Sequence, residues 1–268
     1  MKTTRLLTGV LMVAVLAVVL VSLFRGMGAG MLLNVDAFVI VIGGTFVGAL
    51  IGFPMRRLKA TAADVVSAFR DKGDKDYIVN EIQDCAYINR NDGLRALEDK
   101  VSEIRDDFLR FGINLVVNSY SDNAIRDIME RDMNNKLVNL NFSQNVLKTV
   151  ARLTPSLGLA GTVVSLIKMF KSLDSVETLA PMMAVALMST FYGVIASNLI
   201  AIPLCAKLKE RALMLEAHMA LVITGTMCVS NLEHPTKIEE KLRQYDDVEE
   251  TVGFKGQLRT VPASGLLR

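Results

Sequence analysis

The sequence is poor in the residues that soluble enzymes use for catalysis and metal binding. It has no tryptophan, 2 histidines and 3 cysteines in 268 residues. Cys85, Cys205 and Cys228 show no CxxC spacing. Neither His218 nor His234 has a cluster of cysteines or carboxylates at the spacing of a metal site or a catalytic triad. We therefore expect no metal site, no disulfide and no enzymatic activity.

Signals for nucleotide and nucleic-acid binding are absent as well. The sequence contains neither a P-loop nor a GxGxxG segment, so we expect no ATP binding and no cofactor. The net charge is only +2, and lysines and arginines form no run interleaved with aromatic residues. This pattern excludes the electrostatic footprint of a nucleic-acid partner. Any work that the protein does must draw on another source of energy.

The composition instead indicates a protein that is part membrane and part aqueous. Hydrophobic residues make up 51% of the chain and charged residues 22%, with a mean hydropathy of +0.36. Such a chain is too apolar for a soluble domain and too charged for a bare bundle of membrane spans. We predict an all-α, polytopic membrane protein with a large cytoplasmic helical lobe.

Four segments are apolar enough to cross a bilayer, which takes about 20 helical residues. They are Leu6 to Phe24, Ala37 to Phe53, a segment that begins near Leu153, and Leu179 to Cys205. The first could also be a cleaved signal peptide, but its apolar run is longer than a usual signal core, which favours an uncleaved anchor. The sequence therefore predicts four transmembrane helices in two hairpins.

The positive residues predict the orientation of these spans. Of the 30 lysines and arginines, 15 lie between Arg56 and Lys148 and nine follow Cys205. The connection between the first two spans holds only Arg25, and that between the last two holds only Lys168 and Lys171. Under the positive-inside rule, both termini and the long central segment are cytoplasmic.

The central segment has the periodicity of amphipathic helices. Between Leu94 and Phe108, apolar residues recur at three- and four-residue spacing, which predicts one helix, and Asn91-Asp92-Gly93 predicts a turn before it. After Cys205 the helical pattern continues until His234-Pro235 ends it. The predicted domains are a first hairpin (1–54), a cytoplasmic helical domain (55–150), a second hairpin (151–206), a helical extension (207–246) and a loose tail (247–268).

The third and fourth spans contain small and hydroxyl residues where lipid would favour leucine. The third opens with the segment Thr154 to Thr162, TPSLGLAGT, and the fourth holds Ser189 to Gly193, STFYG, and ends at Pro203. Packing is one explanation, because serines and threonines in helices bond to their own carbonyls and small residues let helices approach. Two such faces in adjacent spans favour the other explanation, an ion path shared with partner subunits.

No span contains a carboxylate in its interior. Hydroxyl groups can coordinate a cation but do not titrate near neutral pH, so the titrating carboxylate must belong to another protein. We interpret Asp36, at the edge of the second span, as a helix cap. In the same span Gly44, Gly48 and Gly52 recur at four-residue spacing, which predicts close helix packing.

Taken together, these segments resemble the MotA/PomA family, the A subunits of bacterial flagellar stators within the MotA/TolQ/ExbB superfamily. The resemblance extends over most of the chain, although the tail and much of 71–148 match only in type. TolQ and ExbB share the style of the last two helices but have three spans and lack the motif around Pro235. The matching motifs are Thr154 to Thr162, Ala184 to Gly193, Pro203, Gly43 to Thr45, and Pro235 with Ile238 to Leu242.

The resemblance implies a motor in the bacterial inner membrane. In the family, five A subunits form a ring around two B subunits of the MotB/PomB type, which have one span, bind peptidoglycan and supply the ion-carrying aspartate. Pro155 and Pro203 match the family prolines that couple ion passage to movement. Arg90 and Glu98 match the charged pair that engages the rotor switch protein FliG, and Arg95 could share that role.

The resemblance also assigns an ion pathway and the close-packing positions. Thr162 and Thr190 coincide with threonines typical of sodium-driven members, so Na⁺ is favoured over H⁺ as the transported ion. Ser189 replaces the first threonine of the pair common in sodium-driven stators, and Glu233-His234 replaces the usual Asp-Asn before the proline. Three glycines of the third and fourth spans join those of the second as packing positions: Gly158, Gly161 and Gly193.

Two other functions stay open at this point. A rotary motor of the same superfamily could drive gliding, envelope energisation or phage defence through a different cargo. A passive channel or scaffold would be favoured if the hydroxyl faces serve packing alone. Binding to the rotor distinguishes the first alternative from a stator, and replacing Thr190 with alanine distinguishes the second.

Overall fold

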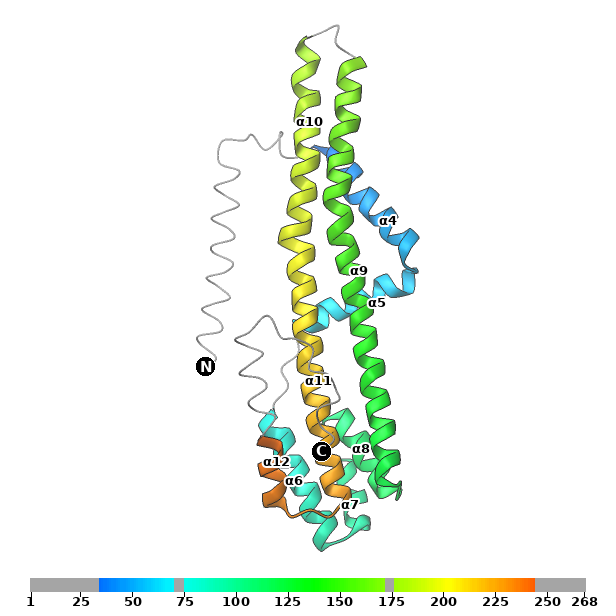
Figure 1. Ribbon diagram of the computed structural model, residues 1–268, viewed down its shortest axis with the longest axis vertical. Coiled ribbons are helices and arrows are strands. Elements are labelled where there is room, and N and C mark those ends of the chain that lie inside the picture. The colour runs from blue at the N-terminus through cyan, green and yellow to red at the C-terminus, as the bar shows by residue number, and fades with distance from the viewer. Residues whose placement is uncertain (1–33, 70–74, 172–175, 244–268) are drawn as a thin grey trace, which may run out of the picture. The chain divides into compact units, whose positions relative to one another are not determined.

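The computed structural model describes residues 34–69, 75–171 and 176–243, and the regular secondary structure of this part of the chain is entirely helical, with no strand (Figure 1). The predicted first span, Leu6 to Phe24, and the tail from Asp247 lie outside the described residues. Three of the described helical stretches are long and apolar enough to cross a membrane: Val35–Gly52, Asp122–Lys171 and Leu179–Ser230. The all-α prediction is confirmed for these residues, and the number of spans stays a prediction.

The helices follow one another with short connections. In chain order they are α3 (Val35–Phe38), the π-helical η1 (Val39–Gly43), α4 (Gly44–Gly52), α5 (Met55–Ala68), α6 (Lys75–Asn91), α7 (Leu94–Val101), α8 (Asp107–Val117), α9 (Asp122–Lys171), α10 (Val176–Ile195), the π-helical η2 (Ala196–Ala201), α11 (Ile202–Ser230) and α12 (Pro235–Arg243).

The chain divides into two compact units. Within the described residues, the membrane unit comprises 34–52, 149–171 and 176–201, and the lobe unit comprises 53–69, 75–148 and 202–243. Helix α9 passes from the lobe unit into the membrane unit, and α10, η2 and α11 return as one continuous helical stretch. The membrane boundaries assigned to the sequence, near residues 54, 150 and 206, stay predictions.

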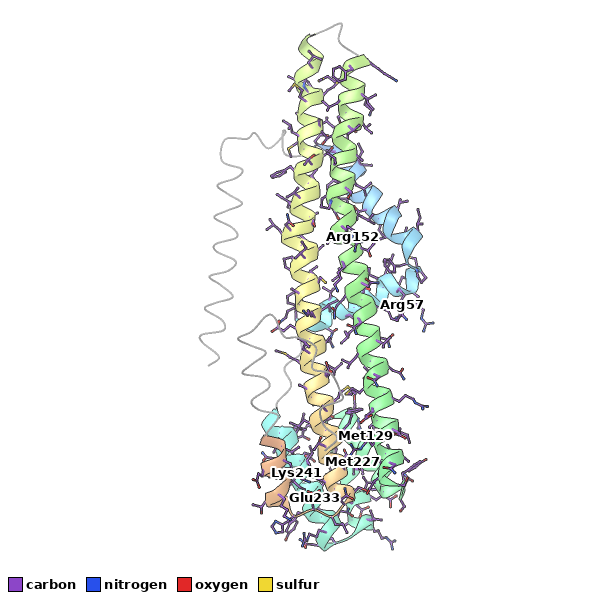
Figure 2. The ribbon with its side chains drawn as sticks, viewed as in Figure 1. Arg57, Met129, Arg152, Met227, Glu233 and Lys241 are labelled. Carbon is purple, nitrogen blue, oxygen red and sulfur yellow. The ribbon has the colours of Figure 1, made fainter. Side chains whose placement is uncertain are left out.

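The lobe unit has an apolar interior built from α6, α7, α8, α11, α12 and the start of α9. Its largest fully buried side chains include Ile82, Leu97, Leu109, Ile113 and Met129. Met129 and Met227 belong to this core, and Glu233 and Lys241 lie beside one another at its α12 edge (Figure 2). Lys241 Nζ donates to both carboxylate oxygens of Glu233 at 2.6 Å. Burial of these side chains is the main source of lobe stability.

Two predictions from the sequence are wrong in detail. The helix predicted from Leu94 to Phe108 is two helices, because α7 ends at Val101 and Asp106 Oδ1 caps α8 by accepting from Leu109 N at 2.7 Å. The periodicity nevertheless marks burial correctly at Leu97, Val101, Ile104 and Phe108, whereas Leu94 is 42% exposed.

The second correction concerns the start of the second span. Asn34, not Asp36, caps α3, since its side-chain oxygen accepts from Ala37 N at 3.2 Å. Asp36 lies two residues after the cap, in the first turn of the helix. Its carboxylate still faces the positive end of the helix dipole there, which explains why a cap was predicted at this position.

Two other features of the sequence pattern, the turn at Gly93 and the length of the helix after Cys205, agree with the structure. Gly93 has φ +82 and separates α6 from α7, as the Asn-Asp-Gly turn predicts. Helix α11 continues to Ser230 despite Gly225. A Cβ at Gly225 would lie 2.5 Å from Ile82 Cδ1, so glycine is needed there because α6 packs directly on the α11 backbone.

Candidate functional site

Helices α9 and α10 approach each other at backbone distance in the membrane unit (Figure 1). A Cβ at Gly158 would lie 2.8 Å from the backbone oxygen of Ser189, and one at Gly193 would lie 2.8 Å from the backbone oxygen of Thr154. Neither position has room for a side chain, since real Cβ atoms do not approach other atoms this closely. The two glycines therefore set the contact between the antiparallel helices and hold the neighbouring side chains in register.

Two threonine hydroxyls meet one turn away from this contact. Thr162 Oγ1 and Thr190 Oγ1 are 2.6 Å apart, and both side chains are half-buried. Thr162 Oγ1 also lies 3.2 Å from the carbonyl oxygen of Gly158 and 3.0 Å from that of Ala186. The sequence-predicted pair of threonines is thus brought together, surrounded by two backbone carbonyls.

The two threonine hydroxyls and the carbonyls of Gly158 and Ala186 form a cluster of four neutral oxygen atoms. A hydroxyl donates one hydrogen bond, so Thr162 can satisfy only one of its three oxygen neighbours at a time. All four oxygens are neutral, and none titrates near neutral pH. Neutral oxygen ligands suit a hard cation, which replaces the hydroxyl protons as the partner of several oxygens at once. The cluster can therefore coordinate a cation but cannot carry a proton by itself.

Ser189 lies apart from the threonine pair. Its hydroxyl donates to the carbonyl oxygen of Val185 in its own helix at 3.0 Å, and the side chain is completely buried. A Cβ at Gly161 would lie 2.8 Å from both Cβ and Oγ of Ser189. Within one chain Ser189 fills the space that Gly161 leaves free, and its predicted part in the ion pathway stays a prediction.

The second span packs on the same helix pair through α4 and η1. A Cβ at Gly44 would lie 3.2 Å from Leu157 Cδ1, and one at Gly48 would lie 3.1 Å from Leu153 Cδ1. At Gly52 an added Cβ would meet no atom within 4 Å. Two of the three glycines in this row therefore lie against α9, and the third faces open space in the single chain.

Tyr192 joins the beginning of the second span to α10, a contact that the sequence did not predict. Its hydroxyl oxygen accepts from the backbone N–H of Asn34 at 3.2 Å. The ring of Phe38 stands edge-on to the Tyr192 ring at 6.2 Å. One of the N-terminal N–H groups that a helix leaves without an internal partner is thus satisfied from α10.

The two prolines occupy different settings. Pro155 lies inside α9, half-buried, and its Cα would be 3.2 Å from a Cβ at Gly193. Pro203 is the second residue of α11, is exposed, and lies two residues after the end of η2. A π-helical turn before a proline widens the helix locally, which removes the clash between the proline ring and the preceding carbonyls.

The predicted rotor-binding charges lie at one corner of the lobe unit. Arg90 is near the end of α6, Arg95 and Glu98 are on α7, and all three side chains are exposed. Arg90 Nη1 reaches the carbonyl oxygen of Leu232 at 3.4 Å, a long hydrogen bond. Next to this residue Asn89 is buried, and its Nδ2 donates to the carbonyl oxygen of Val229 at 2.9 Å, which ties α6 to α11.

A polar network that the sequence did not predict connects three helices of the lobe unit. Ser143 Oγ on α9 donates to Asp64 Oδ2 on α5 at 2.6 Å. Arg211 on α11 donates through Nη1 to the Asp64 carbonyl oxygen at 3.1 Å and also to Ser67 Oγ. These residues sit on polar helix faces, where sequence periodicity indicates solvent, so only the tertiary packing reveals the pairing.

Local contacts and burial determine the setting of three further ionisable side chains of the lobe unit: Asp106, His218 and Cys85. His218 Nε2 is 3.1 Å from Asp106 Oδ2, so the histidine lies at the N-terminal end of α8, next to the Asp106 cap. Burial alone would raise the pKa of Asp106, but hydrogen bonds from His218, Leu109 and Phe108 outweigh it and lower the pKa below 3.8. Burial, reinforced by the nearby Glu81 carboxylate, raises the pKa of the Cys85 thiol to about 12, so it stays protonated. The described residues contain no cluster of metal-ligating side chains.

The chain is similar to bacterial chemotaxis and motility proteins. Residues 100–220 match the model of the MotA/TolQ/ExbB proton channel family. The chain is 28% identical over 232 residues to the chemotaxis protein PomA of Vibrio alginolyticus, covering 85% of this chain and 90% of that protein. It is 28% identical over 231 residues to motility protein A of Treponema pallidum, covering 85% and 89%.

Solved structures show the same fold. The structure of the flagellar MotAB stator complex from Bacillus subtilis matches with a TM-score of 0.80 and 24% identity, over 91% of this chain and 96% of that chain. The structure of C. jejuni MotAB matches with a TM-score of 0.79 and 22% identity, over 87% and 92%. The all-helical fold described above is therefore a known one.

Proposed function

Because the chain belongs to the MotA/TolQ/ExbB proton channel family and is a membrane protein, we propose that it is the A subunit of a flagellar stator. In this proposal it works with a one-span B subunit of the MotB/PomB type and couples cation flow across the bacterial inner membrane to torque on the rotor. The observation that supports it best is the Thr162–Thr190 pair with its two carbonyl neighbours.

The cation passes this oxygen cluster on its way to and from an aspartate of the B subunit. The spans of this chain have no interior carboxylate, so a partner must supply the group that binds the ion strongly. The cluster offers weak, neutral oxygen ligands next to that group. This favours Na⁺ over H⁺, because a bound Na⁺ needs several oxygen ligands and a proton on the aspartate does not. Ser189, packed against Gly161, holds α9 and α10 in the register on which the cluster depends.

The wider assembly in the proposal follows the family. In this proposal the chain has four spans with both termini in the cytoplasm, and it forms a ring-shaped homopentamer. Its contact with the rotor switch protein FliG is made by Arg90, Arg95 and Glu98. The exposure of these three side chains supports the rotor contact, since a charged pair that engages another protein must be accessible. The two prolines, Pro155 and Pro203, are the positions at which ion passage bends the helices.

The test is swimming speed in cells that lack their own stators and express this chain with its B subunit, while Na⁺ is titrated at fixed pH and ionic strength. Speed that rises and saturates with Na⁺ supports the proposal, and sodium-independent swimming shows a proton-driven stator. Cells that express the complex in the membrane but do not swim point to a rotary motor with another cargo.

Isosteric variants test the oxygen cluster. Thr162→Val and Thr190→Val keep the side-chain shape and remove one oxygen each, which should raise the Na⁺ concentration for half-maximal speed about tenfold or more. Thr154→Val is the matched control, because the Thr154 hydroxyl donates only to the Val150 carbonyl of its own helix, at 2.5 Å. An unchanged sodium dependence in both test variants would favour a packing role and a different ion path.

A further inference from the structure

Pro155 leaves one backbone carbonyl of α9 without its helical donor. In an α-helix the carbonyl of residue 151 accepts from the N–H of residue 155, and proline has no N–H. Helix α9 nevertheless continues through this position without interruption. The Ala151 carbonyl oxygen therefore needs a donor from elsewhere, because an unpaired carbonyl in an apolar environment is costly.

Ser197 supplies that donor from the opposite helix. Its Oγ donates to the Ala151 carbonyl oxygen at 2.7 Å, and the side chain is 3% exposed. The antiparallel register explains the reach: Gly193 lies against Pro155, and one turn further along each helix Ser197 lies against Ala151. The bond thus depends on the same close glycine contact that positions the threonine pair.

This use of a hydroxyl is different from that of its neighbours. In the membrane unit the hydroxyls of Thr45, Thr154, Ser156 and Ser189 donate to the carbonyl four residues earlier in their own helix, as hydroxyls in membrane helices commonly do. Thr162 Oγ1 also lies within hydrogen-bond distance of such a carbonyl, that of Gly158. Because a hydroxyl has a single proton, Ser197 gives up this local bond when it donates to Ala151.

Ser197 also belongs to the π-helical segment η2, which ends at Ala201, two residues before Pro203. One hydrogen bond therefore connects the carbonyl freed by Pro155 to the widened turns in front of the second proline. We propose that Ser197 is a positioning residue. It replaces the donor that the Ala151 carbonyl lacks because of Pro155, and it thereby links the two proline positions. In the motor this bond transmits a movement at one proline to the other. That part of the proposal rests on the proposed function.

A thermal-stability cycle on the full chain, purified with its B subunit in detergent, tests the bond without reference to motor activity. Ser197→Ala should lower the melting temperature by about 3–10 °C, because the half-buried Ala151 carbonyl loses its donor. Pro155→Ala restores a backbone N–H at residue 155. In the Pro155→Ala background, Ser197→Ala should therefore shift the melting temperature hardly at all, and this non-additivity is the signature of the bond.

Two further variants separate the bond from general packing. Ser197→Thr keeps the hydroxyl and should retain most of the stability. Thr154→Val removes a buried hydroxyl beside the same proline without freeing a carbonyl, so it should lower the melting temperature far less than Ser197→Ala. The proposal is wrong if Ser197→Ala is as stable as the parent, or if it costs the same in both backgrounds.

The motor readout distinguishes positioning from ion binding. Ser197→Ala should lower the maximal swimming speed severalfold and leave the Na⁺ concentration for half-maximal speed unchanged, whereas Thr162→Val shifts that concentration. A shift in the sodium dependence of Ser197→Ala would instead place Ser197 in the ion path and contradict the positioning role. If the parent chain does not support swimming, the proposed function fails, and the stability cycle still decides whether the bond exists.

Discussion

In the lobe unit large apolar side chains fill the interior, whereas in the membrane unit the closest contacts are made by glycines and hydroxyls. Leu97, Leu109 and Ile113 are completely buried in the lobe unit. In the membrane unit Leu159 and Leu187 are 62% and 69% exposed, and the backbones meet at Gly158 and Gly193. Surface apolar residues next to lipid lose nothing by exposure, since lipid tails are as apolar as leucine.

The difference teaches which interaction holds each unit. Water drives the lobe unit together, so its stability follows the apolar area that it buries. Lipid provides no such force, and association of the membrane helices depends on close packing and hydrogen bonds. Small changes at a glycine or hydroxyl should thus matter most in the membrane unit, and loss of apolar volume should matter most in the lobe unit.

The largest effect is expected from removing apolar volume inside the lobe unit. Leu97→Ala should lower the free energy of unfolding by about 2–5 kcal/mol, because it leaves a cavity in the core. Leu94→Ala, three residues earlier on the same apolar stripe, should cost much less since Leu94 is 42% exposed. Chemical denaturation of the purified complex measures both, and equal losses would show that α7 packs differently from the structure.

Adding volume at the helix contact of the membrane unit should come next. Gly158→Ala places a methyl group 2.8 Å from the Ser189 backbone oxygen and should cost about 1–3 kcal/mol. Gly52→Ala is the matched control, because it meets no atom within 4 Å and should be neutral or slightly stabilising. Thermal melting and swimming speed report the difference, and a tolerated Gly158→Ala would contradict the backbone contact.

The sequence predicted correctly those features that depend on hydrophobic periodicity and on local turn residues. Burial along 97–108, the turn at Gly93 and the length of α11 all follow from local pattern. The end of α7 at Val101 could not be predicted in this way. Periodicity indicates which side of a helix is buried, but it does not indicate whether the helix continues.

Sequence reasoning also paired Thr162 with Thr190, which the structure brings to 2.6 Å. It could not find the donation from Ser197 to Ala151 or from Asn89 to Val229, since both bond to backbone carbonyls of other segments. A signal for the first existed in Pro155, which always leaves the carbonyl four residues earlier without its donor. Which serine supplies that donor depends on the register between the two helices.

Buried polar groups in the lobe unit should respond to substitution with opposite signs. Asn89→Ala should cost about 1–3 kcal/mol, because the Val229 carbonyl is left without its side-chain donor and the amide leaves a space. Thr226 Oγ1 is buried without a hydrogen-bond partner among the described residues. Thr226→Val should therefore be neutral or stabilising by up to about 1 kcal/mol. Denaturation midpoints measure both, and a destabilised Thr226→Val would reveal a partner for the hydroxyl.

A small, pH-dependent effect is expected at the cap of α8, where the ionised Asp106 carboxylate stabilises the lobe unit. The pKa of Asp106 is lower in the folded protein than its ordinary value of 3.8. Its carboxylate therefore stabilises the fold fully above the ordinary value, and this contribution is lost as the pH falls through the folded pKa. Asp106→Asn keeps a cap and the neutral contact to His218, so it should cost about 0.5–1 kcal/mol at pH 7. Stability measured from pH 7 down to pH 3 should fall less steeply in Asp106→Asn than in the parent. Parallel curves would show that the His218 contact does not favour the ionised carboxylate.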